Sequence, residues 1–168
     1  EIGKRMSFEL GRRLPVERPL RVYYSFVPRC YQTADEISNG FKEKGGEVIE
    51  IEPLAILVSP IIADDKVWGH LQPDGKNIAD YVNNWADGNF GSMIEDFAEY
   101  EFRLVDDTLG RLASEKQAAI HVHVTHDLAV MALKRIMLKR PLTPSDREPF
   151  LGGFAISMDE NGFRHQNF

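Results

Sequence analysis

The residues best suited to chemistry are His126 and Asp127, which follow a hydrophobic stretch and precede a helical pattern. Polar side chains at the carboxyl end of a strand, where a helix begins, lie close to free backbone N–H groups and to the positive end of the helix dipole. These features favour an anion, most simply a phosphate group. We therefore expect residues 125–127 to form part of an anion-binding site.

A second group of polar residues follows an earlier hydrophobic stretch, where Ser25 and Arg29 precede another helical pattern. An arginine in a loop just before a helix can bind a phosphate through two parallel hydrogen bonds. Each residue also has a purely structural interpretation. Arg29 would then be a surface residue paired with an acid, and His126 a histidine at a helix start with Asp127 as a dipole partner.

Three histidines of one stretch, His121, His123 and His126, are a candidate metal site. Their spacing resembles the His-x-His-x-Asp-His zinc motif of metallo-β-lactamase-like hydrolases, but Asp127 stands on the wrong side of the last histidine. In a strand, His121 and His123 point to one face, whereas His126 lies beyond the strand end. We therefore expect no metal, and we interpret His121 and His123 as partly buried strand residues.

The order of the expected elements places these residues at strand ends. Hydrophobic periodicity and turn residues predict helices over 2–14, 32–44, 92–114 and 128–139, and strands over 20–25, 47–52, 118–125 and 153–158. Residues 26–31 and 141–149 are expected to be loops, with a turn at 159–162. Alternating strands and helices predict an α/β layered fold with a mainly parallel sheet, which binds ligands at the carboxyl ends of its strands.

Residues 53–91 are rich in Pro, Gly, Asn and Asp, with one short helix expected near 78–85. Such a long irregular segment is often a binding loop or a lid. Four aromatic side chains are candidates for an apolar lid around a leaving group: Trp68, Tyr81, Trp85 and Phe90. The simpler interpretation, which we favour, is that they form a local core.

Length and composition restrict the class of protein. The 168 residues predict one domain over 1–168. The net charge of −6 argues against nucleic-acid binding, although a local Arg and His pocket can still bind a small anion. No apolar run approaches the roughly 20 residues that span a bilayer, so we expect no membrane contact. The single cysteine, Cys30, slightly favours a reducing, cytoplasmic location.

Three blocks of the chain, in this order, resemble the histidine phosphatase superfamily, which contains phosphoglycerate mutase-like and acid phosphatase-like enzymes. Residues 1–14 are similar to the family block Thr/Glu-x-Gly-x-x-Gln/Ser-Ala-x-x-Leu-Gly-x-x-Leu. Residues 25–34 match Ser-x-x-x-Arg-x-x-Gln-Thr-Ala, the most specific of the three, and residues 124–127 are similar to the family's second-histidine motif. The resemblance implies a three-layer α/β/α sandwich with a mainly parallel central sheet.

The resemblance also implies roles for individual residues. Arg29 would bind the transferred phosphoryl group together with Ser25, and His126 would donate a hydrogen bond to its equatorial oxygens. In the acid phosphatase branch, an Asp directly after that histidine gives a proton to the leaving oxygen. Asp127 is therefore our first choice as general acid.

In the mutase branch, the proton donor lies in the segment after the second strand, where Asp64 or Asp65 would take that role. The family's nucleophile is the His of an Arg-His-Gly motif that ends an initial strand, before the block matched by residues 1–14. The 168 residues contain no such motif. We expect the nucleophile in a segment upstream of residue 1, because the family's sheet without this central strand would bury unpaired backbone groups, at about 1–3 kcal/mol each.

The Arg-His-Gln at residues 164–166 follows a turn and is interpreted as a tail. We predict that the chain hydrolyses a phosphorylated small molecule through a phosphohistidine, with no metal and no other cofactor. Two alternatives remain: a non-catalytic relative that binds a phosphate ligand, and a metal-dependent hydrolase that uses the three histidines named above. The sequence leaves assembly into a homo-oligomer open.

Overall fold

The computed structural model describes residues 1–159 and 162–167 of the chain. The helices are α1 (Ile2–Arg13), α2 (Pro28–Glu43), α3 (Ile78–Ala86), α4 (Phe97–Val105), α5 (Arg111–Ala113) and α6 (Asp127–Leu138). The strands are β1 (Leu20–Tyr24), β2 (Val48–Pro53), β3 (Ile120–Val124), β4 (Phe154–Asp159) and β5 (Gly162–Asn167). Strands and helices alternate from β1 to α6, as the hydrophobic pattern predicts.

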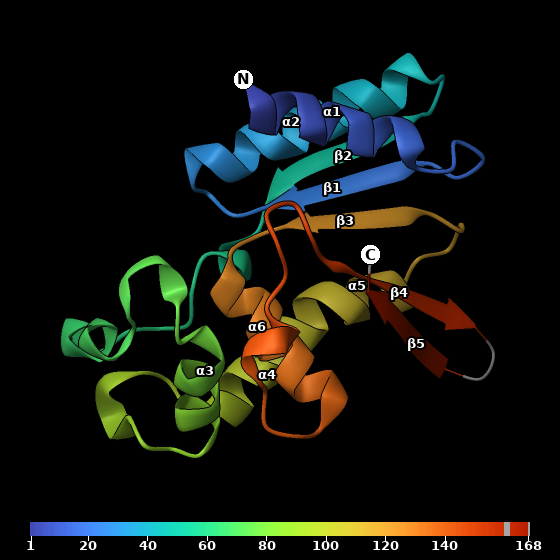
Figure 1. Ribbon diagram of the computed structural model, residues 1–168. Coiled ribbons are helices and arrows are strands. Elements are labelled where there is room, and N and C mark those ends of the chain that lie inside the picture. Colours follow the sequence, from blue (N-terminus) through green and yellow to red (C-terminus); the bar gives the residue numbers. More distant parts are fainter. Residues whose placement is uncertain (160–161, 168) are drawn as a thin grey trace.

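Strands β1, β2 and β3 form a parallel sheet in the order β2-β1-β3. The register aligns Tyr24 of β1 with Pro53 of β2 and with Val124 of β3. The three carboxyl ends therefore lie level at one end of the sheet (Figure 1). This is the end at which a parallel sheet binds its ligands.

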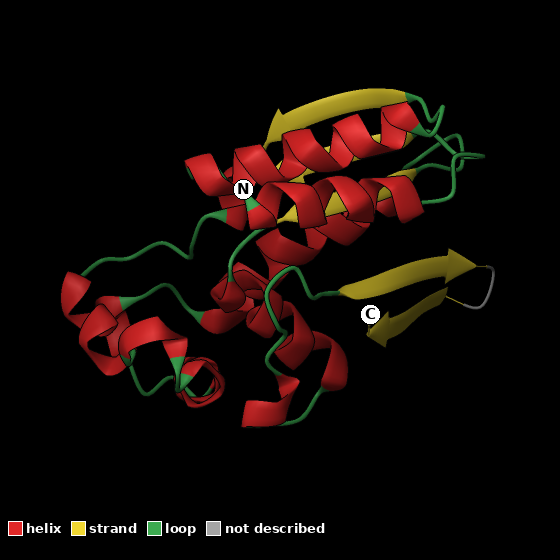
Figure 2. Ribbon diagram, turned by 45° about the horizontal axis from the view of Figure 1, so that its top comes forward, coloured by secondary structure: helices red, strands yellow, loops and turns green. Residues whose placement is uncertain are grey.

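One face of this sheet is covered by α1 and α2, which lie over the strands and run roughly along them (Figure 2). Leu20 and Val22 of β1 pack against Ala34, Ile37 and Phe41 of α2, and each of these side chains is at most 2% exposed. Because alternate residues of a strand point to opposite faces, the intervening residues of β1 must contact a different layer.

The opposite face of the sheet carries Tyr23, His121 and His123, whose rings contact one another. Arg111 of α5 places its guanidinium 5.3 Å from the centre of the Tyr23 ring. Helices α4, α5 and α6 lie on this side of the sheet (Figure 1). The chain therefore has the predicted α/β/α layers, and both histidines are partly buried strand residues, as predicted.

The segment between β2 and α4 packs its aromatic residues into a core that it shares with α4 and α6. Tyr81, Trp85 and Phe90 are at most 5% exposed. Trp68 packs at the edge of this core, with its ring stacked 6.2 Å from that of Tyr81. The interpretation of these four residues as core is confirmed, although this core is not confined to the segment.

Two expected helices differ from those observed. Helix α2 begins at Pro28, so the predicted loop over 26–31 is wrong for residues 28–31. Proline suits the first helical position, because its missing N–H would have no helical partner there. The expected helix over 92–114 begins only at Phe97, after Asp96 caps it through the Ala98 N–H. It then passes through a π-helical turn, Asp106–Gly110, before α5.

Strands β4 and β5 form a separate antiparallel hairpin. The predicted strand over 153–158 is confirmed as β4. The tail interpretation of residues 164–166 is wrong, since their backbone belongs to β5. The expected turn at 159–162 includes residues 160–161, which lie outside the described residues.

Candidate active site

The sequence-predicted site residues on β1 and β3 meet at the level carboxyl ends of these strands. Ser25 follows β1, and its N–H donates to the carbonyl of Val124 at 3.0 Å, which extends the pairing by one residue. Helix α2 begins three residues after Ser25, and α6 begins directly after His126. Two helix N-termini therefore adjoin the same strand ends, where they favour a bound anion.

His126 is held between a hydroxyl and a guanidinium. Its Nε2 lies 2.8 Å from Ser25 Oγ, and its Nδ1 lies 2.9 Å from Arg29 Nη2. An arginine can only donate, so Nδ1 must accept this hydrogen bond. The ring is therefore neutral with its proton on Nε2, which donates to Ser25.

The electrostatic environment agrees with this neutral form. Burial and the guanidinium of Arg29 lower the pKa of His126, while the carboxylate of Asp127 acts in the opposite direction. Ser25 is fully buried and Arg29 is exposed, so the site is open to solvent on the side of Arg29. Contrary to the loop prediction, Arg29 lies in the first turn of α2, where the helix fixes its direction.

Cys30 also lies next to this site, although the sequence did not predict it as a site residue. Its Sγ lies 3.7 Å from Nε2 of His126 and donates to the carbonyl of Thr125 at 3.8 Å. Burial raises the pKa of the Cys30 thiol, although the nearby Arg29 counteracts this effect. A thiol in this state is a packing group rather than a nucleophile. In the sequence, only its position directly after Arg29 could have indicated that Cys30 lies at this site.

Asp127 lies beside His126 in the chain, but its carboxylate contacts a residue that sequence reasoning missed. Arg147 donates through Nε at 2.9 Å and through Nη2 at 2.6 Å to Oδ2 of Asp127. Nη2 of Arg147 also donates to the carbonyl of Asp74 at 2.7 Å. Arg147 belongs to the predicted loop over 141–149, where no motif or periodicity marks it.

Asp64 and Asp65, the alternative proton donors, lie at a 3₁₀ helix over Asp65–His70. Asp64 caps this helix by accepting from the Lys66 N–H at 3.0 Å. Its carboxylate also lies 3.7 Å from the Lys66 ammonium. The hydrogen bonds and ion pairs that join the described residues do not connect either acid to His126.

The three histidines of the metal alternative do not converge. His123 stacks on Tyr23, and His121 meets the same ring edge-on. Nε2 of His121 also lies 3.1 Å from Glu115. His126 lies beyond the strand end, as expected. Within residues 1–159 and 162–167, no three or more His, Cys, Asp or Glu side chains gather in a way that could hold a metal ion.

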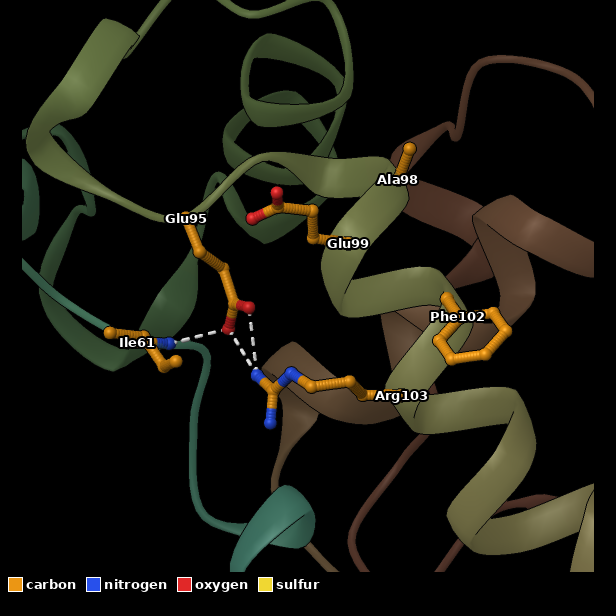
Figure 3. A pocket seen from close by; sticks show the side chains of 6 residues that line it. All are labelled: Ile61, Glu95, Ala98, Glu99, Phe102 and Arg103. Atoms are coloured by element: carbon orange, nitrogen blue, oxygen red, sulfur yellow. Dashed lines mark hydrogen bonds and ion pairs between the residues drawn. The ribbon is translucent and has the colours of Figure 1, made fainter.

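A concave region lies apart from these residues, beside α4. It is lined by Ile61, Glu95, Ala98, Glu99, Phe102 and Arg103 (Figure 3). Within it, the largely buried Glu95 accepts from Arg103 and from the N–H of Ile61. None of the predicted site residues lines this region.

Comparison with known proteins places the chain by its fold. No family model matches the sequence, and a search of curated proteins gives no match either. Among solved structures, Bacillus stearothermophilus YhfR is similar over 98% of this chain and 80% of its own, with a TM-score of 0.63 and 21% sequence identity. YhfR has a phosphoglycerate mutase-like fold, and this chain has an α/β fold of that class. Among the described helices, none is long and apolar enough to cross a membrane.

Proposed function

We propose that this chain is a phosphatase of the histidine phosphatase type, which hydrolyses a phosphorylated small molecule. The observation that carries the proposal is the 2.9 Å contact between Arg29 and His126, two residues that are far apart in the sequence. Both lie where a parallel sheet of this class binds its ligands, next to two helix N-termini. A phosphate group would bind between them.

Each group of the site has a role in this reaction. The phosphate would replace the direct bond between Arg29 and His126, so that the guanidinium binds two of its oxygens. Once the guanidinium no longer occupies Nδ1 of His126, this nitrogen would take up a proton and donate a hydrogen bond to a third oxygen, while Nε2 stays bonded to Ser25, which orients the ring. Phosphoryl transfer depends mainly on such positioning and electrostatic stabilisation.

The nucleophile would come from a strand that pairs with the outer edge of β3. The backbone groups of Ile120 and Val124 form hydrogen bonds with β1. Those of the intervening His121 and His123 therefore point away from β1, toward the outer edge of β3. Among the described strands, none pairs with this edge. A parallel strand there would end level with His126. We propose that a phosphohistidine, expected from the family resemblance, lies on such a strand.

Asp127 remains our first choice as general acid. It follows His126 directly and lies in the first turn of α6. The alternative donors, Asp64 and Asp65, belong to the 3₁₀ helix described above, where Lys66 provides the contacts of Asp64. Arg147 binds Oδ2 of Asp127, so Oδ1 would carry the proton for the leaving oxygen.

The test is hydrolysis of p-nitrophenyl phosphate by the full-length gene product in the presence of a metal chelator. We expect turnover that falls by about 10²-fold or more in His126→Ala, because a stabilising donor to the transferred phosphoryl group is lost. The exposed His70→Ala is the matched control and should be active. Near-normal turnover of His126→Ala would refute the assignment.

A second candidate function is binding of a phosphate ligand without hydrolysis. It is favoured by one observation, the lack of an Arg-His-Gly motif in the 168 residues. Phosphate binding that depends on Arg29 and His126, together with no turnover by the full-length protein, would select this candidate.

A further inference from the structure

Arg147 joins three segments that are distant in the chain. Its guanidinium binds Oδ2 of Asp127 at the start of α6 and the carbonyl of Asp74 in the turn Pro73–Gly75. Arg147 itself belongs to the loop that follows the 3₁₀ helix Pro144–Asp146. One side chain therefore connects the segment between β2 and α4, the loop after α6 and the residue beside His126.

The backbone of the turn is shaped to fit this contact. Asp74 has a φ of 58° and Gly75 a φ of 63°, a conformation that side-chain-bearing residues rarely adopt. A Cβ on Gly75 would lie 3.5 Å from Nη2 of Arg147 and 3.7 Å from Oδ2 of Asp127. The turn thus packs directly on the ion pair and presents a carbonyl to it.

Stability alone does not account for this arrangement. The side chains of Arg147 and Asp127 are 36% and 48% exposed, and ion pairs at that exposure contribute little to the free energy of unfolding. A strained residue is usually kept where the surrounding structure uses it. Asp127 lies next to His126, which indicates that this arrangement of the ion pair and the turn has a role at the candidate active site.

We propose that Arg147 is a positioning residue that holds the carboxylate of Asp127 and the turn Pro73–Gly75 in one closed arrangement beside His126. This inference rests on the proposed function and adds a residue that positions its general acid. Both hydrogen bonds from Arg147 go to Oδ2 of Asp127, so they orient the carboxyl group and leave Oδ1 free. Oδ1 takes a proton from solvent and passes it to the leaving oxygen as the P–O bond breaks. The resulting carboxylate stays bonded to Arg147 through Oδ2.

The first test measures the coupling without any activity assay. Hydrogen exchange of the amides of Gly75 and Lys76, which bond Gln72 and Pro73, reports on the turn. We expect several-fold faster exchange in Arg147→Ala and a smaller change in Arg147→Lys. Arg140→Ala is the matched control, because Arg140 forms an ion pair with Asp146 in the same loop. Unchanged exchange in Arg147→Ala, or an equal change in the control, would overturn the proposal.

The second test separates positioning of the acid from general damage to the site. An alkyl leaving group such as that of glycerol 2-phosphate needs a proton, whereas p-nitrophenolate leaves readily without one. In Arg147→Ala we expect kcat to fall about tenfold more for glycerol 2-phosphate than for p-nitrophenyl phosphate. Equal losses for the two esters would overturn the positioning role. If the wild-type protein hydrolyses neither ester, the proposed function fails, and the exchange measurement still decides the coupling.

Discussion

At the scale of single residues, the candidate site depends on two hydrogen bonds that fix one histidine. Ser25 and Arg29 hold opposite nitrogens of His126, so the ring presents a defined tautomer. The sequence was sufficient to select these three residues, because Ser25 and His126 stand at strand ends before helices and Arg29 follows Ser25 in the same motif. It gave no sign of Arg147, whose partner Asp127 is brought to it only by the path of the loop after α6.

A buried histidine makes stability depend on pH. Burial, with smaller effects of His121 and Arg111, lowers the pKa of His123 to about 3. The folded state thus favours the neutral ring. This contribution to stability is complete above the unfolded pKa of about 6.5 and is lost as the pH falls toward 3.

We expect His123→Phe to reduce this acid sensitivity, since Phe retains the stacking on Tyr23 but takes up no proton. Between pH 7 and pH 4.5, its free energy of unfolding should fall by about 3 kcal/mol less than that of the wild type. Urea denaturation at both pH values measures the difference. The exposed His70→Phe should follow the wild type, and parallel losses in His123→Phe and the wild type would show that His123 does not titrate in this way.

At the scale of elements, two glycines bring α1 and α2 into backbone contact. A Cβ on Gly11 would collide with the backbone of Ile37, and a Cβ on Gly40 with that of Phe8. The sequence predicts both helices, but glycine is a poor helix former, so propensity alone offers no reason for either residue. The reason lies in tertiary packing, which a single sequence does not reveal.

We expect Gly11→Ala and Gly40→Ala each to lower the free energy of unfolding by about 1–3 kcal/mol, because the backbones must move apart. The higher helix propensity of alanine would otherwise stabilise both variants. Thermal denaturation followed by circular dichroism measures the change. Gly69→Ala is the control, since nothing lies within 4 Å of its added Cβ. An unchanged Tm for Gly11→Ala would contradict the close crossing.

At the scale of the whole molecule, the α/β layers and the parallel sheet followed from the alternation of hydrophobic patterns. The structure of the segment between β2 and α4 could not be predicted in this way, because its 3₁₀ helices and the isolated bridge between Ile62 and Ile94 arise from long-range contacts. Strand β5 was missed because its only strand partner among the described residues is β4. The level strand ends nevertheless bring Ser25, Arg29 and His126 together, as the sequence predicts.

The account depends most on whether these residues bind phosphate. Calorimetric titration of the full-length protein with inorganic phosphate measures this directly. We predict binding that weakens about 10- to 100-fold in Arg29→Ala and in His126→Ala, since each removes a charge-assisted hydrogen bond. Arg140→Ala should bind as the wild type does. Equal phosphate affinity in all four proteins, or no binding by the wild type, would contradict the central claim.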